Sequence, residues 1–135
     1  MILMSDYFGP WMNHADATDQ VKEDAEAFLV KVNDLLDEAF ENMIDLIYNP
    51  ATGTLVSGSK YGGFRPSDCK QGAPDSSHKK GRGLDIYDKG NPLDNWITDK
   101  ILERHGLYRE APLDTPNWCH LTDRSPRSGR RTFKP

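Results

Sequence analysis

The pattern of apolar positions after Thr18 predicts one long amphipathic helix. Apolar residues recur every three or four positions from Val21 to Ile47, and charged side chains fill most positions between them. This spacing places an apolar stripe along one side of a helix. Because Thr18 is a suitable N-cap, we expect the helix to cover residues 18–47. Its stripe packs against the rest of the domain or pairs with another chain, and packing within the domain is the preferred interpretation.

The rest of the chain alternates between short strand-like runs, turns and one further helix. The expected strand-like segments are 55–58, 61–66, 83–87, 107–110 and 117–121. In the 83–87 strand, Leu84 and Ile86 should face one side of the sheet and Asp85 the other. A second helix should begin at Asn91-Pro92 and end at Gly106, a C-cap glycine.

Together these elements predict an α+β fold, with a small antiparallel sheet packed by helices and a long N-terminal helix. The 135 residues are enough for one domain and too few for two ordinary ones. We therefore expect a single domain over residues 1–135. It begins with an aromatic arm around Gly9-Pro10, which should pack back on the domain, and ends with a basic tail.

The charge distribution argues against nucleic-acid binding as a general function. The net charge is −4, from 17 basic and 21 acidic residues, whereas nucleic-acid-binding domains are usually basic. The last twelve residues contain no acid and five basic residues, Arg124, Arg127, Arg130, Arg131 and Lys134. This tail is either a solvated segment or a site for an acidic partner.

The N-terminus and the cysteines bear on whether the protein is secreted. The first residues include no positively charged region, and their apolar run ends after four residues, unlike a signal peptide or a membrane span. We therefore expect a protein made in a cytoplasm without a secretion signal, and no membrane partner. Cys69 and Cys119 form no disulfide framework. Each is a packed thiol, a soft ligand near the metal site described next, or one half of a cross-bridge.

The segment from Ser76 to Ile86 contains the most informative residues, a His and an Asp seven positions apart. His78 and Asp85 offer an imidazole and a carboxylate, which suit a divalent ion such as zinc. His120 would be a third ligand. Three protein ligands leave a fourth tetrahedral position for water, which is the arrangement of a catalytic zinc site.

The other two histidines have simpler interpretations. His14 lies beside Asp16 in a predicted solvated turn where no third ligand is expected. His105 falls in the last turn of the second predicted helix, where a cationic imidazole interacts favourably with the helix dipole.

Three sequence motifs lie around the predicted ligands. Ser76, His78, Gly81 and Asp85 fit the pattern S-x-H-x-x-G-x-x-x-D. An S-G-x-x-x-x-x-F-R-P motif containing Arg65 precedes it, and a W-x-H motif ending at His120 follows. In this combination the chain resembles the M15 zinc peptidases, which include D-alanyl-D-alanine carboxypeptidases and bacteriophage endolysins. The resemblance covers residues 57–121, close to half of the chain.

The resemblance implies a zinc-dependent peptidase that hydrolyses the stem or cross-link peptides of peptidoglycan. His78, Asp85 and His120 would be the Zn²⁺ ligands, and Arg65 would contact the substrate carboxylate or carbonyl. Ser76 matches the serine beside the ligand loop. Because the layout resembles small phage-encoded members, the expected place of synthesis is a host cytoplasm. The expected place of action is the bacterial cell wall, reached on release or from within the virion.

The resemblance is incomplete at the general base. Many members have Glu or Asp three residues before the last His, where this chain has Asn117, and its Trp stands two residues before that His rather than one. Since an amide cannot accept the proton, we expect Glu110 or Asp114 to do so, if either does, and prefer Glu110. The alternative is a weakly active or inactive metal-binding component of a phage particle. It would associate with other phage structural proteins or with itself through the long helix.

Overall fold

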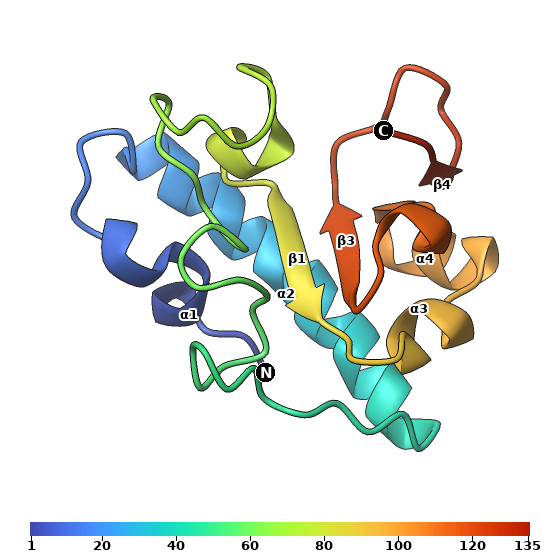
Figure 1. The fold of residues 1–135 in the computed structure, drawn as a ribbon. Helices are drawn as coiled ribbons and strands as arrows, with labels where there is room; N and C mark the ends of the chain where they lie inside the picture. Colours follow the sequence, from blue (N-terminus) through green and yellow to red (C-terminus); the bar gives the residue numbers. More distant parts are fainter.

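A four-stranded sheet lies at the centre of the structure, a computed structural model that describes residues 1–135 (Figure 1). Its strands are β1 (Gly83–Tyr87), β2 (Tyr108–Glu110), β3 (Trp118–Thr122) and β4 (Thr132–Phe133), in the order β1-β3-β2-β4. β3 is antiparallel to β1 and β2, but β4 is parallel to β2. The prediction of an α+β fold is confirmed. The sheet is mixed rather than antiparallel, because the basic tail returns along the free edge of β2.

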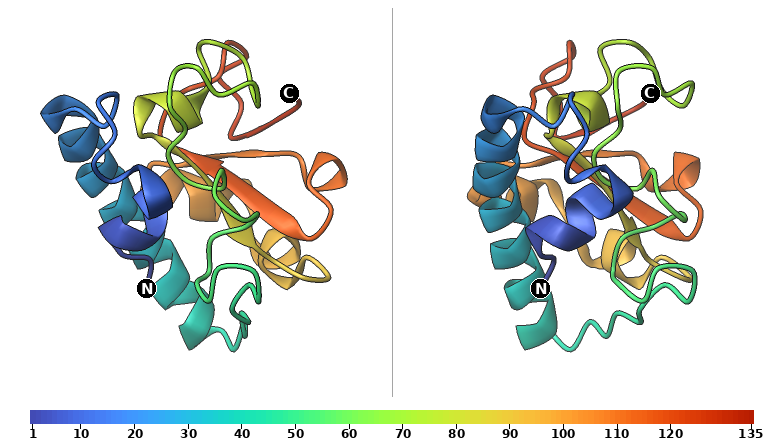
Figure 2. Two further views of the ribbon diagram at one scale, coloured as in Figure 1. Left: turned by 60° about the vertical axis from the view of Figure 1, so that its left-hand side comes forward. Right: turned by 90° about the vertical axis from the view of Figure 1, so that its left-hand side faces the viewer.

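Four α-helices surround the sheet, and α2 covers the face that is buried in the core. They are α1 (Met4–Phe8), α2 (Asp19–Glu41), α3 (Pro92–Trp96) and α4 (Asp99–His105). α2 crosses behind the sheet in Figure 1 and stands to its left in both views of Figure 2. Its buried residues are Ala25, Phe28, Leu29, Val32, Leu35, Leu36 and Ala39. The stripe therefore packs within the domain, as preferred from the sequence. None of the helices is both long and apolar enough to cross a membrane.

α2 ends at Glu41, six residues before the predicted end at residue 47. Met43 adopts a left-handed conformation with φ 62°. The amide of Ile44 then donates to the carbonyl of Ala39, and that of Met43 to Phe40. This is a Schellman motif, which terminates a helix. Sequence inspection missed it because the left-handed position is usually a glycine.

The region predicted as one helix between residues 92 and 106 is two helices. α3 ends at Trp96, and α4 starts after Thr98, whose Oγ1 accepts a hydrogen bond from the Ile101 amide. The predicted C-cap at Gly106 is confirmed, with φ 68°. At the start of α3 the carboxylate of Asp88, rather than the side chain of Asn91, accepts from the first amides.

The segments 55–58 and 61–66 are not strands, but they cover the outer edge of β1. Val56 forms one isolated bridge with Ile86. The Ser57 amide donates to the Asp85 carbonyl at 2.8 Å, and the Asp85 amide donates to the Gly62 carbonyl at 2.7 Å. Repeated glycines prevent a longer ladder here, although the backbone groups of β1 are still satisfied.

The aromatic arm packs back on the domain, as predicted. Tyr7 and Phe8 are fully buried, and the Tyr7 hydroxyl donates to the Gly83 carbonyl at the start of β1. The Tyr7 carbonyl accepts from the Phe64 amide at 3.1 Å. A Cβ on Gly63 would lie 1.9 Å from that carbonyl oxygen. Only glycine therefore allows the arm and the 62–64 segment to approach so closely.

Replacing Tyr7 by phenylalanine is expected to lower the free energy of unfolding by about 1–2 kcal/mol, because the buried Gly83 carbonyl loses its donor. Burial raises the pKa of Tyr7 far above its usual range, so the hydroxyl remains a donor in any practical buffer. Chemical denaturation measures the change. Tyr48→Phe is the control, because that side chain is exposed. Equal stability of the two variants would contradict the prediction.

Candidate metal centre

One row of polar residues crosses the face of the sheet opposite α2. Asp85 on β1 is the register partner of His120 on β3. The β2–β3 register, in which Arg109 pairs with Leu121, places Glu110 opposite His120 when it is extended by one residue. Glu110 in turn pairs with Phe133 on β4. Neighbouring strands lie about 4.8 Å apart, so the sheet presents these side chains next to one another.

The alternation of side chains along the strands creates this row. The residues on the other face of β1 and β3, Leu84, Ile86, Cys119 and Leu121, are all fully buried in the core. Asp85 and His120 are only partly buried, since they point away from α2. The predicted orientations of Asp85 and His120 are confirmed.

His78 reaches the row from the 3₁₀ turn Ser77–Lys80, immediately before β1. Ser76 caps this turn by accepting a hydrogen bond from the His78 amide at 3.3 Å. The imidazole Nδ1 lies 2.8 Å from the Gly63 carbonyl oxygen. Because a carbonyl oxygen only accepts, Nδ1 carries a proton, and the other ring nitrogen, Nε2, lies 3.4 Å from Asp85 Oδ1. Burial lowers the pKa of His78, which favours the neutral form that binds metals.

Both imidazoles converge on one oxygen of Asp85. Its Oδ1 lies 3.4 Å from His78 Nε2 and 2.7 Å from His120 Nδ1. Zinc with ligand bonds of about 2.0–2.1 Å at tetrahedral angles separates its ligand atoms by roughly 3.3 Å. The first distance matches this value, whereas the second is that of a hydrogen bond between the His120 imidazole and the carboxylate. The three residues form a group that could hold a metal ion.

The electrostatic environment keeps the Asp85 carboxylate ionised. Burial by itself would raise the pKa of Asp85, but its interactions with the His78 and His120 imidazoles outweigh burial and hold it well below its usual range. Oδ2, the other carboxylate oxygen, accepts from Arg65 Nη2 at 3.3 Å. An ionised carboxylate is the form that coordinates a metal.

Arg65 lies beside this carboxylate, and one of its three guanidinium nitrogens has no hydrogen-bond partner within the chain. Its Nε donates to the Tyr61 carbonyl at 2.7 Å and its Nη2 to Asp85. Nη1 makes no hydrogen bond within the chain and lies beneath Gly72, where an added Cβ would come within 3.0 Å of it. The guanidinium is thus fixed at two nitrogens, and its third can bind an oxygen of a ligand.

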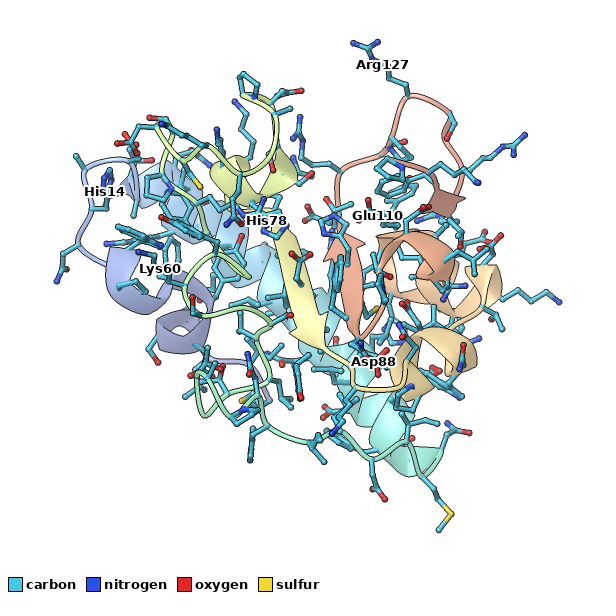
Figure 3. The ribbon with its side chains drawn as sticks, in the orientation of Figure 1. His14, Lys60, His78, Asp88, Glu110 and Arg127 are labelled. Atoms are coloured by element: carbon cyan, nitrogen blue, oxygen red, sulfur yellow. The ribbon has the colours of Figure 1, made fainter.

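Glu110 shares a cavity of about 460 Å³ with the three candidate ligands. In Figure 3, His78 lies to the left of β3 and Glu110 to its right. Burial raises the pKa of Glu110, and the charges of Asp85 and Asp114 add to this effect, while His120 opposes it. A carboxylate with a raised pKa is a better proton acceptor than an exposed one.

Asp114 and Asn117 do not line this cavity. Asp114 is exposed on the turn Pro112–Asp114. Asn117 has φ 69°, and its side-chain oxygen accepts from the Gly90 amide at 3.0 Å. Its side chain therefore fixes the turn before β3, and of the two candidate bases, Glu110 and Asp114, only Glu110 lines the cavity.

Phe133 is a part of the cavity that sequence inspection missed. Its ring meets the His120 ring edge-on, with centroids 6.3 Å apart. The sequence predicts that the basic tail is solvated or binds an acidic partner, but residues 131–133 are half-buried and Arg131 stacks on Tyr108. Arg127 and Arg130 are exposed and fit the solvated interpretation. The β-branched and aromatic pair Thr132-Phe133 within the tail was the available signal for a strand.

Neither cysteine belongs to the metal centre. Cys119 is buried on the core face of β3, and Cys69 is half-buried in a loop. Both are free thiols, and neither lines the metal cavity. Cys119 is a packed thiol, and the alternatives of a metal ligand and of a cross-bridge are wrong, because the pleat of β3 turns Cys119 away from His120.

The remaining histidines lie elsewhere. His105 is in the last turn of α4, as predicted, and its Nε2 lies 3.3 Å from the Glu38 carboxylate. Asp68 joins His14 and Asp16, so the expectation that no third ligand is near was wrong. Asp16 already accepts two hydrogen bonds from Ser67, and the group is partly exposed. It lacks the burial of the His78 group.

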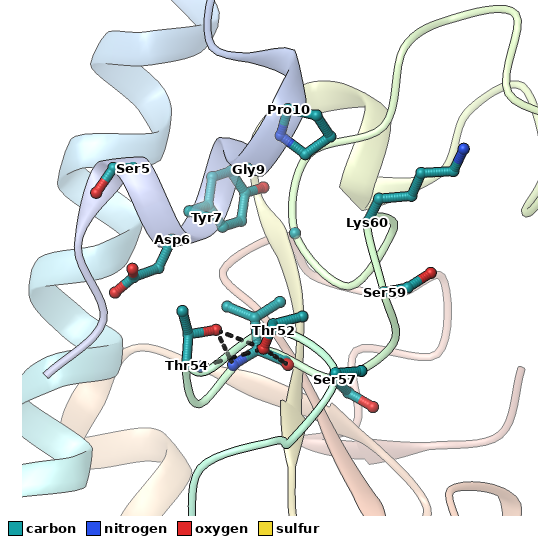
Figure 4. A pocket seen from close by; sticks show the side chains of 13 residues that line it. Ser5, Asp6, Tyr7, Gly9, Pro10, Thr52, Thr54, Ser57, Ser59 and Lys60 are labelled. Carbon is teal, nitrogen blue, oxygen red and sulfur yellow. Dashed lines mark hydrogen bonds between the residues drawn. The ribbon is translucent and has the colours of Figure 1, made fainter.

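A separate cavity of about 320 Å³ lies between α1 and the 51–60 segment (Figure 4). The hydroxyls of Thr52 and Thr54 hydrogen bond to each other across 3.0 Å, and Thr54 also accepts from the Val56 amide. None of the candidate ligands lines this cavity. It is therefore not part of the metal centre.

Comparison with known proteins does not extend this description. No protein-family model matches the chain, and no curated protein or solved structure is significantly similar to it.

Proposed function

We propose that the chain is a zinc-dependent peptidase of M15 type that hydrolyses stem or cross-link peptides of peptidoglycan. One observation carries the proposal. The nitrogens of His78 and His120 converge on one oxygen of Asp85 inside a cavity that also holds Glu110 and Arg65. The substrate class, a phage origin and action at the bacterial cell wall rest on the sequence resemblance.

His78 Nε2, Asp85 Oδ1 and His120 Nδ1 would hold the ion. Bound there, zinc would lower the pKa of a water molecule toward ~7 and polarise the substrate carbonyl. The His78 imidazole is fixed in one tautomer. The Gly63 carbonyl fixes the tautomer of His78, and such an outer hydrogen bond orients a metal ligand and raises its basicity.

Glu110 is the group proposed to move the proton. Its carboxylate accepts a proton from the attacking water and returns it to the nitrogen of the leaving amine. The free Nη1 of Arg65 donates to the carbonyl oxygen as negative charge develops there. Asp85 and Tyr61 hold the guanidinium in place for this role.

Metal analysis of the purified protein, combined with peptidoglycan digestion, tests the proposal. We expect about one zinc per chain and release of new amino groups from purified peptidoglycan. Chelation should remove both, and added zinc should restore both. Protein that carries no zinc, or activity that survives complete chelation, would contradict the proposal.

A structural role in a phage particle is the second candidate, and Asn117 favours it. An amide stands where many M15 members have a carboxylate, and it is engaged in a turn. Stoichiometric zinc without any release of amino groups, in a protein recovered from assembled particles, would support this role over the peptidase.

A further inference from the structure

Another cavity, with a volume of about 380 Å³, lies beside the N-terminal arm and is called the aromatic cavity below. Two aromatic rings, those of Trp11 and Tyr61, line it. Its other lining residues are His14, Pro66, Asp68, Cys69, Lys70 and Gln71. In Figure 3, His14 and Lys60, which flank the two rings, lie to the left of His78. The volume falls in the range of small-molecule sites.

The two rings are held in fixed positions. Trp11 Nε1 donates to the Lys60 carbonyl at 2.9 Å. The Lys60 ammonium lies 5.3 Å from the centre of the Tyr61 ring and 6.0 Å from that of Trp11, close enough for a cation–π interaction. The backbone carbonyl of Tyr61 accepts from Arg65 at 2.7 Å. A ligand that packs on these rings therefore has little side-chain entropy to remove.

Part of each ring face remains uncovered. The rings are nearly parallel, at 14°, but their centroids are 5.8 Å apart. Carbon atoms in contact are only about 3.5–4.0 Å apart, so the rings are displaced sideways and overlap incompletely. Both side chains are accordingly half-buried rather than buried. The rings thus contribute flat apolar surface to the aromatic cavity.

Polar groups that are unused within the chain surround this surface. The side chains of Asp68, Lys70 and Gln71 are exposed and make no hydrogen bond or ion pair with another residue. His14 Nδ1 accepts from the Asp16 amide at 3.0 Å, which leaves Nε2 as a free donor. The aromatic cavity therefore offers both donors and acceptors around an apolar surface.

This combination fits a sugar ring. One face of a pyranose consists of C–H groups that pack against an aromatic ring, while its hydroxyl and acetamido groups donate and accept hydrogen bonds around the rim. The opposite charges of Asp68 and Lys70 give no preference for a charged ligand. A nucleotide also has a flat ring, but its phosphate needs several cationic donors, and Lys70 is the only lysine or arginine that lines the aromatic cavity.

We propose that the aromatic cavity binds a saccharide, which in peptidoglycan is an N-acetylated hexosamine of the glycan strand. The saccharide chemistry rests on the cavity itself, and the assignment to a glycan strand rests on the peptidase function proposed above. Tyr61 and Gln71 also line a cavity of about 300 Å³ that contains Arg65 and Asp85. The sugar therefore binds beside the metal centre and holds the polymer by a part that the hydrolysis leaves unchanged.

A tetramer of β-1,4-linked N-acetylglucosamine is the probe, because it is uncharged and contains no peptide. Calorimetric titration into the zinc-loaded protein is expected to give a dissociation constant of about 1 mM or lower. Chelation of the zinc should leave this binding in place, since none of the three candidate ligands lines the aromatic cavity. Absence of binding would overturn the proposal. Binding that disappears with the zinc would also overturn it, because the sugar would then lie at the metal centre.

Substitutions of Tyr61 test the place of binding. Tyr61→Ala is expected to weaken binding of the tetramer at least about tenfold, because one of the two rings is lost. Tyr61→Phe keeps the ring and should stay within about threefold of the wild type. Tyr48→Ala is the matched control, since that tyrosine is exposed and lines none of these cavities. Circular dichroism checks the fold, and unchanged affinity in folded Tyr61→Ala would overturn the proposal.

The double variant Lys70→Ala with Gln71→Ala tests the polar groups without touching a ring. Both side chains are exposed, so the fold should be unaffected. Loss of their hydrogen bonds is expected to weaken binding of the tetramer about fivefold. Adenosine monophosphate is the competitor that tests the ligand class. Displacement of the tetramer by an equal concentration of this nucleotide would show that any flat ring binds, and the saccharide assignment would be wrong.

Failure of this proposal can be told apart from failure of the proposed function, because the tetramer contains no bond that a peptidase cuts. Release of amino groups from peptidoglycan by a protein that does not bind the tetramer would overturn the saccharide site and leave the peptidase proposal intact. Binding of the tetramer by a protein that releases no amino groups would support the saccharide site and overturn the peptidase proposal.

Discussion

Replacing Glu110 by glutamine is expected to lower kcat by about 10²–10⁴-fold, because the amide cannot accept a proton from the attacking water. Glu110 is not one of the three candidate metal ligands, so zinc should stay bound at the wild-type stoichiometry. The substitution preserves the size of the side chain, and KM should change little. Steady-state kinetics on a soluble peptidoglycan fragment, together with metal analysis, measure both effects.

Asp114→Asn is the matched control for this experiment. Asp114 was the other candidate base, but it is exposed on the turn Pro112–Asp114 and does not line the metal cavity. Its loss should leave kcat within about threefold of the wild type, since exposed charges have weak effects at a distance. Full activity in Glu110→Gln, or a large loss in Asp114→Asn, would show that the base has been wrongly assigned.

Replacing Asp85 by asparagine is expected to weaken zinc binding by at least about 100-fold and to abolish activity. Loss of a residue that only supports a ligand typically costs 10–100-fold in metal affinity, and Asp85 is itself a candidate ligand. Its carboxylate also holds His78, His120 and Arg65 together. Competition with a chromophoric chelator measures the affinity, and circular dichroism checks that the variant is folded.

The control for Asp85→Asn is Asp75→Asn. Asp75 lines the same cavity, but its side chain is exposed and pairs with Arg124. Its substitution should preserve zinc affinity. If Asp85→Asn bound zinc as tightly as the wild type, the three-residue metal centre would be disproved.

Those features of the site that depend on local periodicity could be predicted from the sequence. The alternation Leu84-Asp85-Ile86 placed the carboxylate opposite the core, and Trp118-Cys119-His120 did the same for the imidazole. The N-cap at Thr18 and the C-cap at Gly106 were also correctly predicted. Each follows from the side-chain chemistry or the conformational preference of residues close together in the sequence.

The features that were missed depend on contacts distant in sequence or on unusual residues. The early end of α2 requires a left-handed Met43, where sequence patterns lead one to expect glycine. Strand β4 is only two residues long and forms because β2 has a free edge beside it. Nothing in the sequence near Phe133 indicates that its ring meets His120.

The contacts of the N-terminal arm have a thermodynamic consequence for the proposed zinc site. The Tyr7 carbonyl binds the 62–64 segment, and the Gly63 carbonyl binds His78. Docking of the arm and coordination of the ion therefore favour the same arrangement of this segment. Linkage then requires their coupling to be reciprocal. The factor by which a docked arm raises zinc affinity is also the factor by which zinc shifts the arm toward its docked state, although no arm residue touches the ion.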